Sequence, residues 1–174
     1  LLTKAGLHQR PAPPRGSGKV PGARGRIDCT DQPALLLRSW TDSSAPGLPA
    51  VHVEARDGGC RLWLHAPAVA ERIMGSNALD LWLRERMEAL CLGDSWQPLL
   101  QPSINAATSF VPGDVAEAVT ARIDVSQEGE LTDWEFCLST VKPVAFVGVA
   151  QLKALDERKP KSRSIPAALK EIKE

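Results

Sequence analysis

The sequence contains no tyrosine, and five tryptophans and three phenylalanines make up an aromatic content of only 5%. It also lacks any apolar run that approaches the roughly 20 residues of a membrane-spanning helix. No positively charged end leads into an apolar segment of the kind that signal peptides carry. These absences predict a soluble protein with no membrane span.

Cysteine is scarce and scattered. Cys29, Cys60, Cys91 and Cys137 lie at least 31 positions apart, so the chain has no C-x-x-C pair. Closely paired cysteines are the usual sign of small zinc or redox sites, and disulfide-rich secreted domains carry more of them. We therefore expect no metal and no other cofactor. Because the cysteines form no disulfide framework, we also expect the protein to reside in a reducing intracellular compartment, either the cytosol or the interior of an organelle such as a plastid or mitochondrion.

The remaining composition is that of a folded domain. The chain has 174 residues, of which 43% are hydrophobic and 24% are charged. These values lie near the average of soluble globular proteins, and the length suffices for one domain with a hydrophobic core.

The formal net charge of zero conceals an uneven distribution along the chain. Residues 1–26 hold six basic and no acidic side chains, whereas residues 27–152 hold 8 basic and 17 acidic ones, a balance of −9. Residues 153–174 hold seven basic and four acidic side chains. Because phosphate binding requires cationic side chains, the acidic body is a poor surface for nucleic acid, and any RNA contact is expected in the basic ends.

The first 25 residues are rich in proline, glycine and arginine and show no sustained hydrophobic period. Such a segment is typical of an extended arm, which either contacts RNA or an acidic partner or remains a solvated linker. Tryptophans can anchor a protein interface or stack on bases, and those in loops are the candidates here. The acidic body favours a protein partner for them. The candidate partner- or RNA-binding residues are Arg10, Arg15, Lys19, Arg24, Arg26, Trp40 and Trp96.

Alternating polarity predicts two β-hairpins. The first joins residues 51–54 to 60–65 through Asp57-Gly58-Gly59, and the second joins 117–125 to 131–141 through 127–130. A short strand is expected at 35–37, and the proline-containing residues 41–49 are expected to form a loop.

Residues 77–92 carry apolar side chains at helical spacing, and Asn77 is a suitable N-cap. We expect a loop over 93–103 and a polar, partly helical tail after Pro143. Trp82 on the helix and Trp63 on a strand are expected to pack in the core, and Asp28 to Asp31 to form a turn that caps its own backbone. The fold class is mixed α/β (α+β), with antiparallel hairpins and packed helices.

Taken in order, several segments resemble the first half of the catalytic RNB domain of the ribonuclease II and ribonuclease R exoribonucleases. The segments that carry the resemblance are 26–33 (RIDCTDQP), 50–54 (AVHVE), 62–66 (LWLHA), 75–80 (GSNALD) with Arg84 and Arg86, 109–113 (SFVPG), and 129–143. The resemblance divides the chain into an arm at 1–25, an RNB-like domain at 26–150 and a basic, partly helical tail at 151–174.

The chain departs from that family at the metal site. The resemblance implies a cluster of magnesium-binding aspartates just before the counterpart of Ala50, where this sequence reads Pro46-Gly47-Leu48-Pro49. Magnesium requires hard oxygen ligands, and Asp42 is the only nearby carboxylate. Family tyrosines are also replaced, at Cys91 and near Gly148, as is an acid at Pro67.

No other catalytic arrangement is evident. His8 lies in the arm, and His52 and His65 fall on hairpin strands, where a packed or surface histidine is commoner than a catalytic one. The sequence has no G-x-S-x-G motif and no phosphate-binding loop.

We therefore expect no enzyme activity. The expected function is that of an RNB-like pseudoenzyme, a binding or structural subunit of a larger protein or ribonucleoprotein assembly. One alternative is an autonomous RNA-binding regulator that uses its basic arms. Another is a magnesium-dependent 3′-to-5′ exoribonuclease, or a fragment of one.

Overall fold

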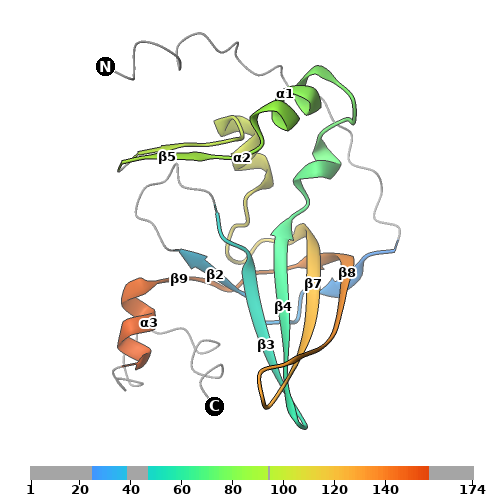
Figure 1. Cartoon of the computed structure of the whole chain (residues 1–174), viewed down its shortest axis with the longest axis vertical. Helices are drawn as coiled ribbons and strands as arrows, with labels where there is room; N and C mark the ends of the chain where they lie inside the picture. The colour runs from blue at the N-terminus through green and yellow to red at the C-terminus, as the bar shows by residue number, and fades with distance from the viewer. Residues whose placement is uncertain (1–24, 39–46, 94, 157–174) are drawn as a thin grey trace.

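The computed structural model describes residues 25–38, 47–93 and 95–156. Among these residues, strands are more frequent than helices (Figure 1). The elements are, in chain order, β1 (Ile27–Cys29), β2 (Leu35–Arg38), β3 (Ala50–Arg56), β4 (Gly59–Pro67), the 3₁₀ turn η1 (Val69–Arg72), α1 (Ala78–Arg86), β5 (Leu90–Leu92), β6 (Ser95–Gln97), α2 (Pro102–Thr108), β7 (Ala116–Ser126), β8 (Leu131–Val141), β9 (Ala145–Gly148) and α3 (Val149–Asp156).

Seven strands form one mixed sheet in the spatial order β1-β8-β7-β4-β3-β2-β9. The two predicted hairpins are confirmed as β3–β4 and β7–β8, and β4 pairs with β7 so that both hairpins share one antiparallel sheet. The predicted mixed α/β class is confirmed, but its description as antiparallel hairpins is only partly right, because β1 pairs with β8 and β2 pairs with β9 in parallel.

Two short segments connect the strands at one end of this sheet to the strands at the other end. Only residues 142–144 separate β8 from β9, and only 30–34 separate β1 from β2. Residues 30–34 and 142–144 run side by side, and the Val144 amide donates a hydrogen bond to the Ala34 carbonyl oxygen at 2.9 Å. The sheet therefore curls on itself, and its interior holds the core cluster of Cys29, Ala34, Leu36, Ala50, Trp63, Phe110, Ala118 and Val141.

Gly59 permits the close approach of β4 to β7. A Cβ atom at this position would lie 1.9 Å from the Val125 carbonyl oxygen, a separation that no side chain tolerates. The tight turn at Asp57-Gly58-Gly59 thus sets how the two hairpins pair.

The predicted helix over 77–92 begins where expected and ends early. The Asn77 side chain accepts a hydrogen bond from the Asp80 amide at 2.8 Å, which confirms the N-cap. The helix ends at Arg86, because Met87 has a positive φ of 66° and an 80% exposed side chain. Residues 90–92 form β5 instead, which pairs with β6.

Two further expectations were wrong in detail. The predicted loop over 93–103 contains β6, and α2 follows with Pro102 in its first turn, a favourable position for proline. The predicted tail after Pro143 begins with the sheet strand β9, and α3 follows it directly. The turn at Asp28 is confirmed, since its carboxylate accepts from the Thr30 amide at 3.0 Å.

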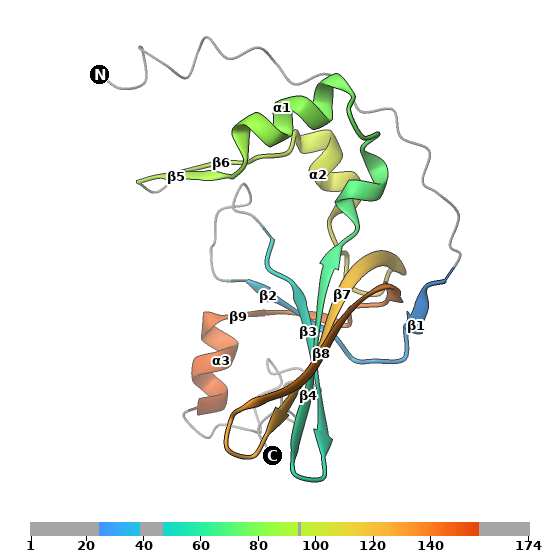
Figure 2. The ribbon, with the colours of Figure 1, turned by 45° about the vertical axis from the view of Figure 1, so that its right-hand side comes forward.

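Helices α1 and α2 and the β5–β6 hairpin lie beyond the ends of the long strands, and α3 lies beside β9 (Figures 1 and 2). No helix within the described ranges is long and apolar enough to cross a membrane.

Candidate functional site

Two of the seven residues predicted to bind a partner or RNA lie in the described structure. Arg10, Arg15, Lys19, Arg24 and Trp40 lie outside the described residues. Trp96 is half-buried in β6, opposite Cys91 of β5. Arg26 immediately precedes β1, far from Trp96 in the sequence, and its contacts are internal.

The Arg26 side chain is only 5% exposed. Its guanidinium pairs with the Glu71 carboxylate of η1, and Nη1 donates to the backbone carbonyl of Ser139 at 3.1 Å. The Nε atom lies 3.9 Å from Glu117 Oε1. Arg26 therefore ties the start of β1 to η1, β7 and β8.

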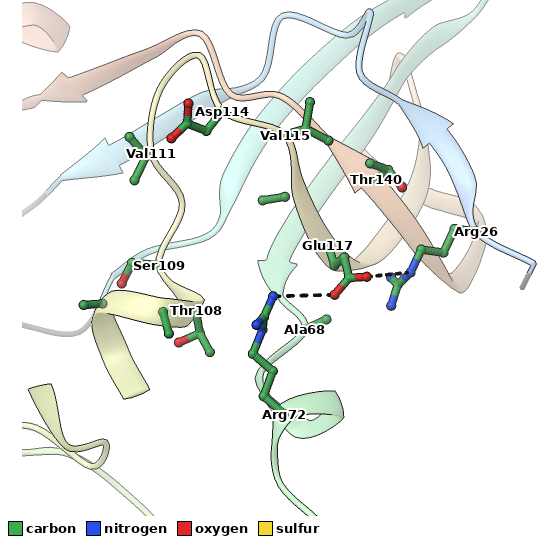
Figure 3. Close-up of a pocket in the computed structure, with 13 residues that line it drawn as sticks. Arg26, Ala68, Arg72, Thr108, Ser109, Val111, Asp114, Val115, Glu117 and Thr140 are labelled. Carbon is green, nitrogen blue, oxygen red and sulfur yellow. Dashed lines mark ion pairs between the residues drawn. The ribbon is translucent and has the colours of Figure 1, made fainter. Parts of the chain in front are cut away.

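These charges form one wall of a pocket of about 630 Å³ at the end of the sheet (Figure 3). Glu117 bridges Arg26 and Arg72, and the Arg72 Nη2 atom lies 3.7 Å from Glu117 Oε2. Asp114 is the only other charged lining residue, so the two cations and two carboxylates balance. The remaining wall is mostly small side chains of α2 and the loop after it, and the pocket offers no excess positive charge for a phosphate.

A row of buried polar side chains crosses the sheet next to Arg26. His65 Nδ1 lies 2.8 Å from Thr120 Oγ1, and Thr120 Oγ1 lies 2.5 Å from Ser139 Oγ. All three residues are completely buried. Of the two predicted roles of His65, a packed or a surface histidine, the structure shows the packed one. Thr120 and Ser139 were not identified from the sequence, because polar residues alternate along both strands and nothing local marks these two as buried.

Burial disfavours the charged imidazolium of His65. Desolvation, with a smaller contribution from the nearby His52, lowers the pKa of His65 from its usual 6.5 to about 4. His65 is therefore neutral at neutral pH and stabilises the sheet as a hydrogen-bonding group. Enclosed in this way, its ring does not reach the surface.

The segment that precedes Ala50 lies at the sheet surface. Gly47, Leu48 and Pro49 are exposed and have no regular secondary structure, whereas Ala50 is completely buried. The other half of this predicted loop, including Asp42 and Pro46, lies outside the described residues. Within the ranges that the structure describes, no group of three or more histidine, cysteine, aspartate or glutamate side chains is placed to hold a metal ion.

Comparison with known proteins identifies the fold. The family model of the RNB domain matches residues 26–174. Among solved structures, RNase R from Mycoplasma genitalium in complex with double-stranded RNA matches with a TM-score of 0.75 and 18% identity, over 87% of this chain and 27% of that one. Among proteins of curated function, none matches the sequence.

Two further matches concern fungal proteins. Yeast Ssd1, a pseudonuclease, matches with a TM-score of 0.65 and 21% identity, over 79% of this chain and 17% of that one. An active-site mutant of the Dss1 exoribonuclease from Candida glabrata matches with a TM-score of 0.66 and 18% identity, over 84% of this chain and 21% of that one. The chain thus spans about a quarter or less of the length of these structures.

Proposed function

The chain belongs to the RNB-domain family, and we propose that it is a catalytically inactive member of that family. Its proposed role is that of a binding or structural subunit of a larger protein or ribonucleoprotein assembly. The observation that carries the proposal is the sequence Pro46-Gly47-Leu48-Pro49, which offers no carboxylate where the family resemblance implies the magnesium ligands. A solved neighbour with this fold, yeast Ssd1, is itself a pseudonuclease. That neighbour supports a role for the fold without catalysis.

The balance of charge supports protein partners for the body of the chain. Residues 27–152 carry a formal charge of −9, and the two cations of the pocket wall are matched by carboxylates. An RNA backbone would meet repulsion over most of this surface. RNA contacts belong to the basic ends of the chain, residues 153–174 and the more strongly basic residues 1–24, which include Arg10, Arg15, Lys19 and Arg24.

Copurification from native extract at low salt tests this proposal. The tagged full chain is expected to elute in an assembly much larger than the monomer, with a fixed set of proteins in mass spectrometry that persists after ribonuclease treatment. Recovery as a free monomer would contradict the proposal. Loss of all companions on ribonuclease treatment would favour the alternative, an autonomous RNA-binding regulator.

A deletion of residues 1–24 separates the two roles. It removes the basic arm but keeps Arg26, whose internal ion pairs anchor β1. The deletion is expected to lower any salt-sensitive RNA association and to leave the protein companions in place.

A further inference from the structure

Strand β8 has an open edge over most of its length. On one side β7 lies along the whole strand, whereas on the other side β1 pairs only with residues 139–141. Gly25 has a positive φ of 85°, so the strand conformation of β1 does not extend past this residue. Among the residues that the structure describes, nothing else pairs with residues 131–138, and we call this stretch the free edge of β8.

The free edge offers backbone hydrogen bonds to an added strand. In an antiparallel pair, alternate residues direct their N–H and C=O groups away from the partner, so about half of residues 131–138 direct theirs outward. Edge strands are usually protected by proline, by lysine or by short length. The free edge reads LTDWEFCL, which contains none of the protecting residues, and it is longer than β9 at the other end of the sheet. Strand addition therefore meets no built-in obstacle here.

The two sides of the free edge differ in chemistry, because successive side chains of a strand point to opposite sides of the sheet. Trp134, Phe136 and Leu138 point to one side and form an apolar row. Trp134 is 57% exposed and Phe136 is 69% exposed, and their rings meet edge to face with centroids 5.7 Å apart. Asp133 and Glu135 point to the other side and form an acidic row.

The acidic row carries more negative charge than its neighbours balance. Asp133 and Glu135 share one cation, Arg122, at 2.8 and 3.3 Å. The nearby Arg61 is bound to Asp124 through two hydrogen bonds. The side chains of Asp133 and Glu135 are 61% and 47% exposed, against 19% for Arg122, so an incoming group meets the carboxylates before the guanidinium.

The two rows together determine which kind of segment fits. An added strand places its side chains directly opposite those of β8, so its successive residues meet the apolar row and the acidic row in turn. A segment that alternates apolar residues with lysine or arginine matches both rows. An α-helix satisfies its own backbone groups and would reach only one side of the sheet, so it would not use the free edge.

A second copy of the chain does not fit the free edge. Two such edges, paired antiparallel with their apolar rows on the same side, also bring their acidic rows together. Asp133 and Glu135 of both copies would then share only the two Arg122 side chains. Like charges directly opposite each other destabilise a pair of strands. The phosphates of RNA would be repelled by the same carboxylates.

We infer that the free edge of β8 binds an extended segment of a protein partner, in which apolar residues alternate with lysine or arginine, by adding it to the sheet as a further strand. This inference rests on the proposed function as a subunit and states which surface carries the assembly. The backbone hydrogen bonds hold the segment, and the apolar and acidic rows select its sequence.

Hydrogen exchange tests the mode of binding. The probe is a synthetic peptide of alternating valine and lysine, added to the purified full chain, and NMR follows the exchange of each backbone amide. Saturating peptide is expected to slow exchange at least tenfold at alternate residues of 131–138. A control peptide of the same composition, with all valines before all lysines, is expected to have no such effect. Unchanged exchange over 131–138, or equal protection by both peptides, would overturn the inference.

Charge reversal at the acidic row separates this inference from the proposed function. Asp133→Lys is expected to reduce the companion proteins recovered from native extract at least fivefold. Its matched control is Glu85→Lys, which makes the same change of charge at an exposed position of α1 and is expected to leave the companions unchanged. Arg122 keeps Glu135 in the Asp133→Lys variant, so the fold should persist, which circular dichroism checks.

A second variant, Phe136→Thr, truncates the apolar row with a residue that favours strands, and it is expected to reduce the companions to a similar extent. Companions that persist at the wild-type level in either variant would overturn the docking edge and leave the proposed function standing. A wild-type chain that elutes as a free monomer would overturn both.

Discussion

Replacing Arg26 with alanine is expected to lower the free energy of unfolding by about 3 kcal/mol. The guanidinium is almost completely buried and binds the Glu71 carboxylate and the Ser139 carbonyl. Its removal leaves the partly buried Glu71 without this cation, whereas Glu117 keeps its ion pair with Arg72. Because an unpaired buried charge costs far more than a lost surface contact, this substitution should be among the most damaging single changes in the domain.

Urea denaturation followed by circular dichroism measures the effect. The matched control is Arg84→Ala, since Arg84 also forms an ion pair, with Asp80, but its side chain is 73% exposed. Exposed ion pairs of this kind contribute less than about 1 kcal/mol to the free energy of unfolding. If the two variants lost equal stability, the buried network would not have the structural role assigned to it.

Stability is also expected to fall as the pH is lowered from about 6.5 towards 4, through His65. Its pKa is about 4 in the folded protein because burial opposes the charge, whereas the unfolded chain has the usual value near 6.5. Between these values the unfolded state binds the additional proton, so the folded state loses stability as the pH decreases. The largest slope that one such proton supports is about 1.4 kcal/mol per pH unit.

The His65→Gln variant isolates this contribution. The carboxylates titrate in both proteins, so the difference in unfolding free energy between wild type and variant should shrink as the pH falls from 6.5 to 4. A difference that stayed constant across this range would show that His65 titrates normally in the folded state. Equilibrium denaturation at several pH values provides the measurement.

The hairpins could be read from the sequence because their signals are local. Alternating side chains around Asp57-Gly58-Gly59 and around 127–130 define both pairs of strands, and the Asn77 cap defines the start of α1. The curl of the sheet was not predictable in this way. It depends on the parallel pairings of β1 with β8 and β2 with β9, which join residues more than 100 positions apart.

The alternation also indicated the two sides of the sheet but not which of them is covered. Val119 and Ile123 share one side of β7, yet Val119 is 38% exposed, and Thr120 on the other side is completely buried. From hydrophobicity alone, the side with Val119 and Ile123 would be expected to be buried and the side with Thr120 to be exposed. A polar row buried by the curl, with an apolar face left outside, requires the three-dimensional arrangement of all four strands.

The role of Arg26 illustrates a similar limit. In the sequence it is one of six cations in an arm without acids, a composition typical of a nucleic-acid contact. Its partners Glu71 and Glu117 lie 45 and 91 positions away and become neighbours only in the fold. We therefore expect the loss of Arg26 to appear first in stability, whereas its part in RNA or partner binding stays a prediction.

The most direct test of the central claim is an assay for magnesium-dependent degradation of a single-stranded oligoribonucleotide by the purified chain, with an active exoribonuclease of the same family as the positive control. The account predicts no shortening of the substrate beyond that in the protein-free reaction, with or without magnesium. Degradation that requires magnesium, stops on chelation and is lost in an Asp42→Asn variant would contradict it, because the segment before Ala50 would then hold a working metal site.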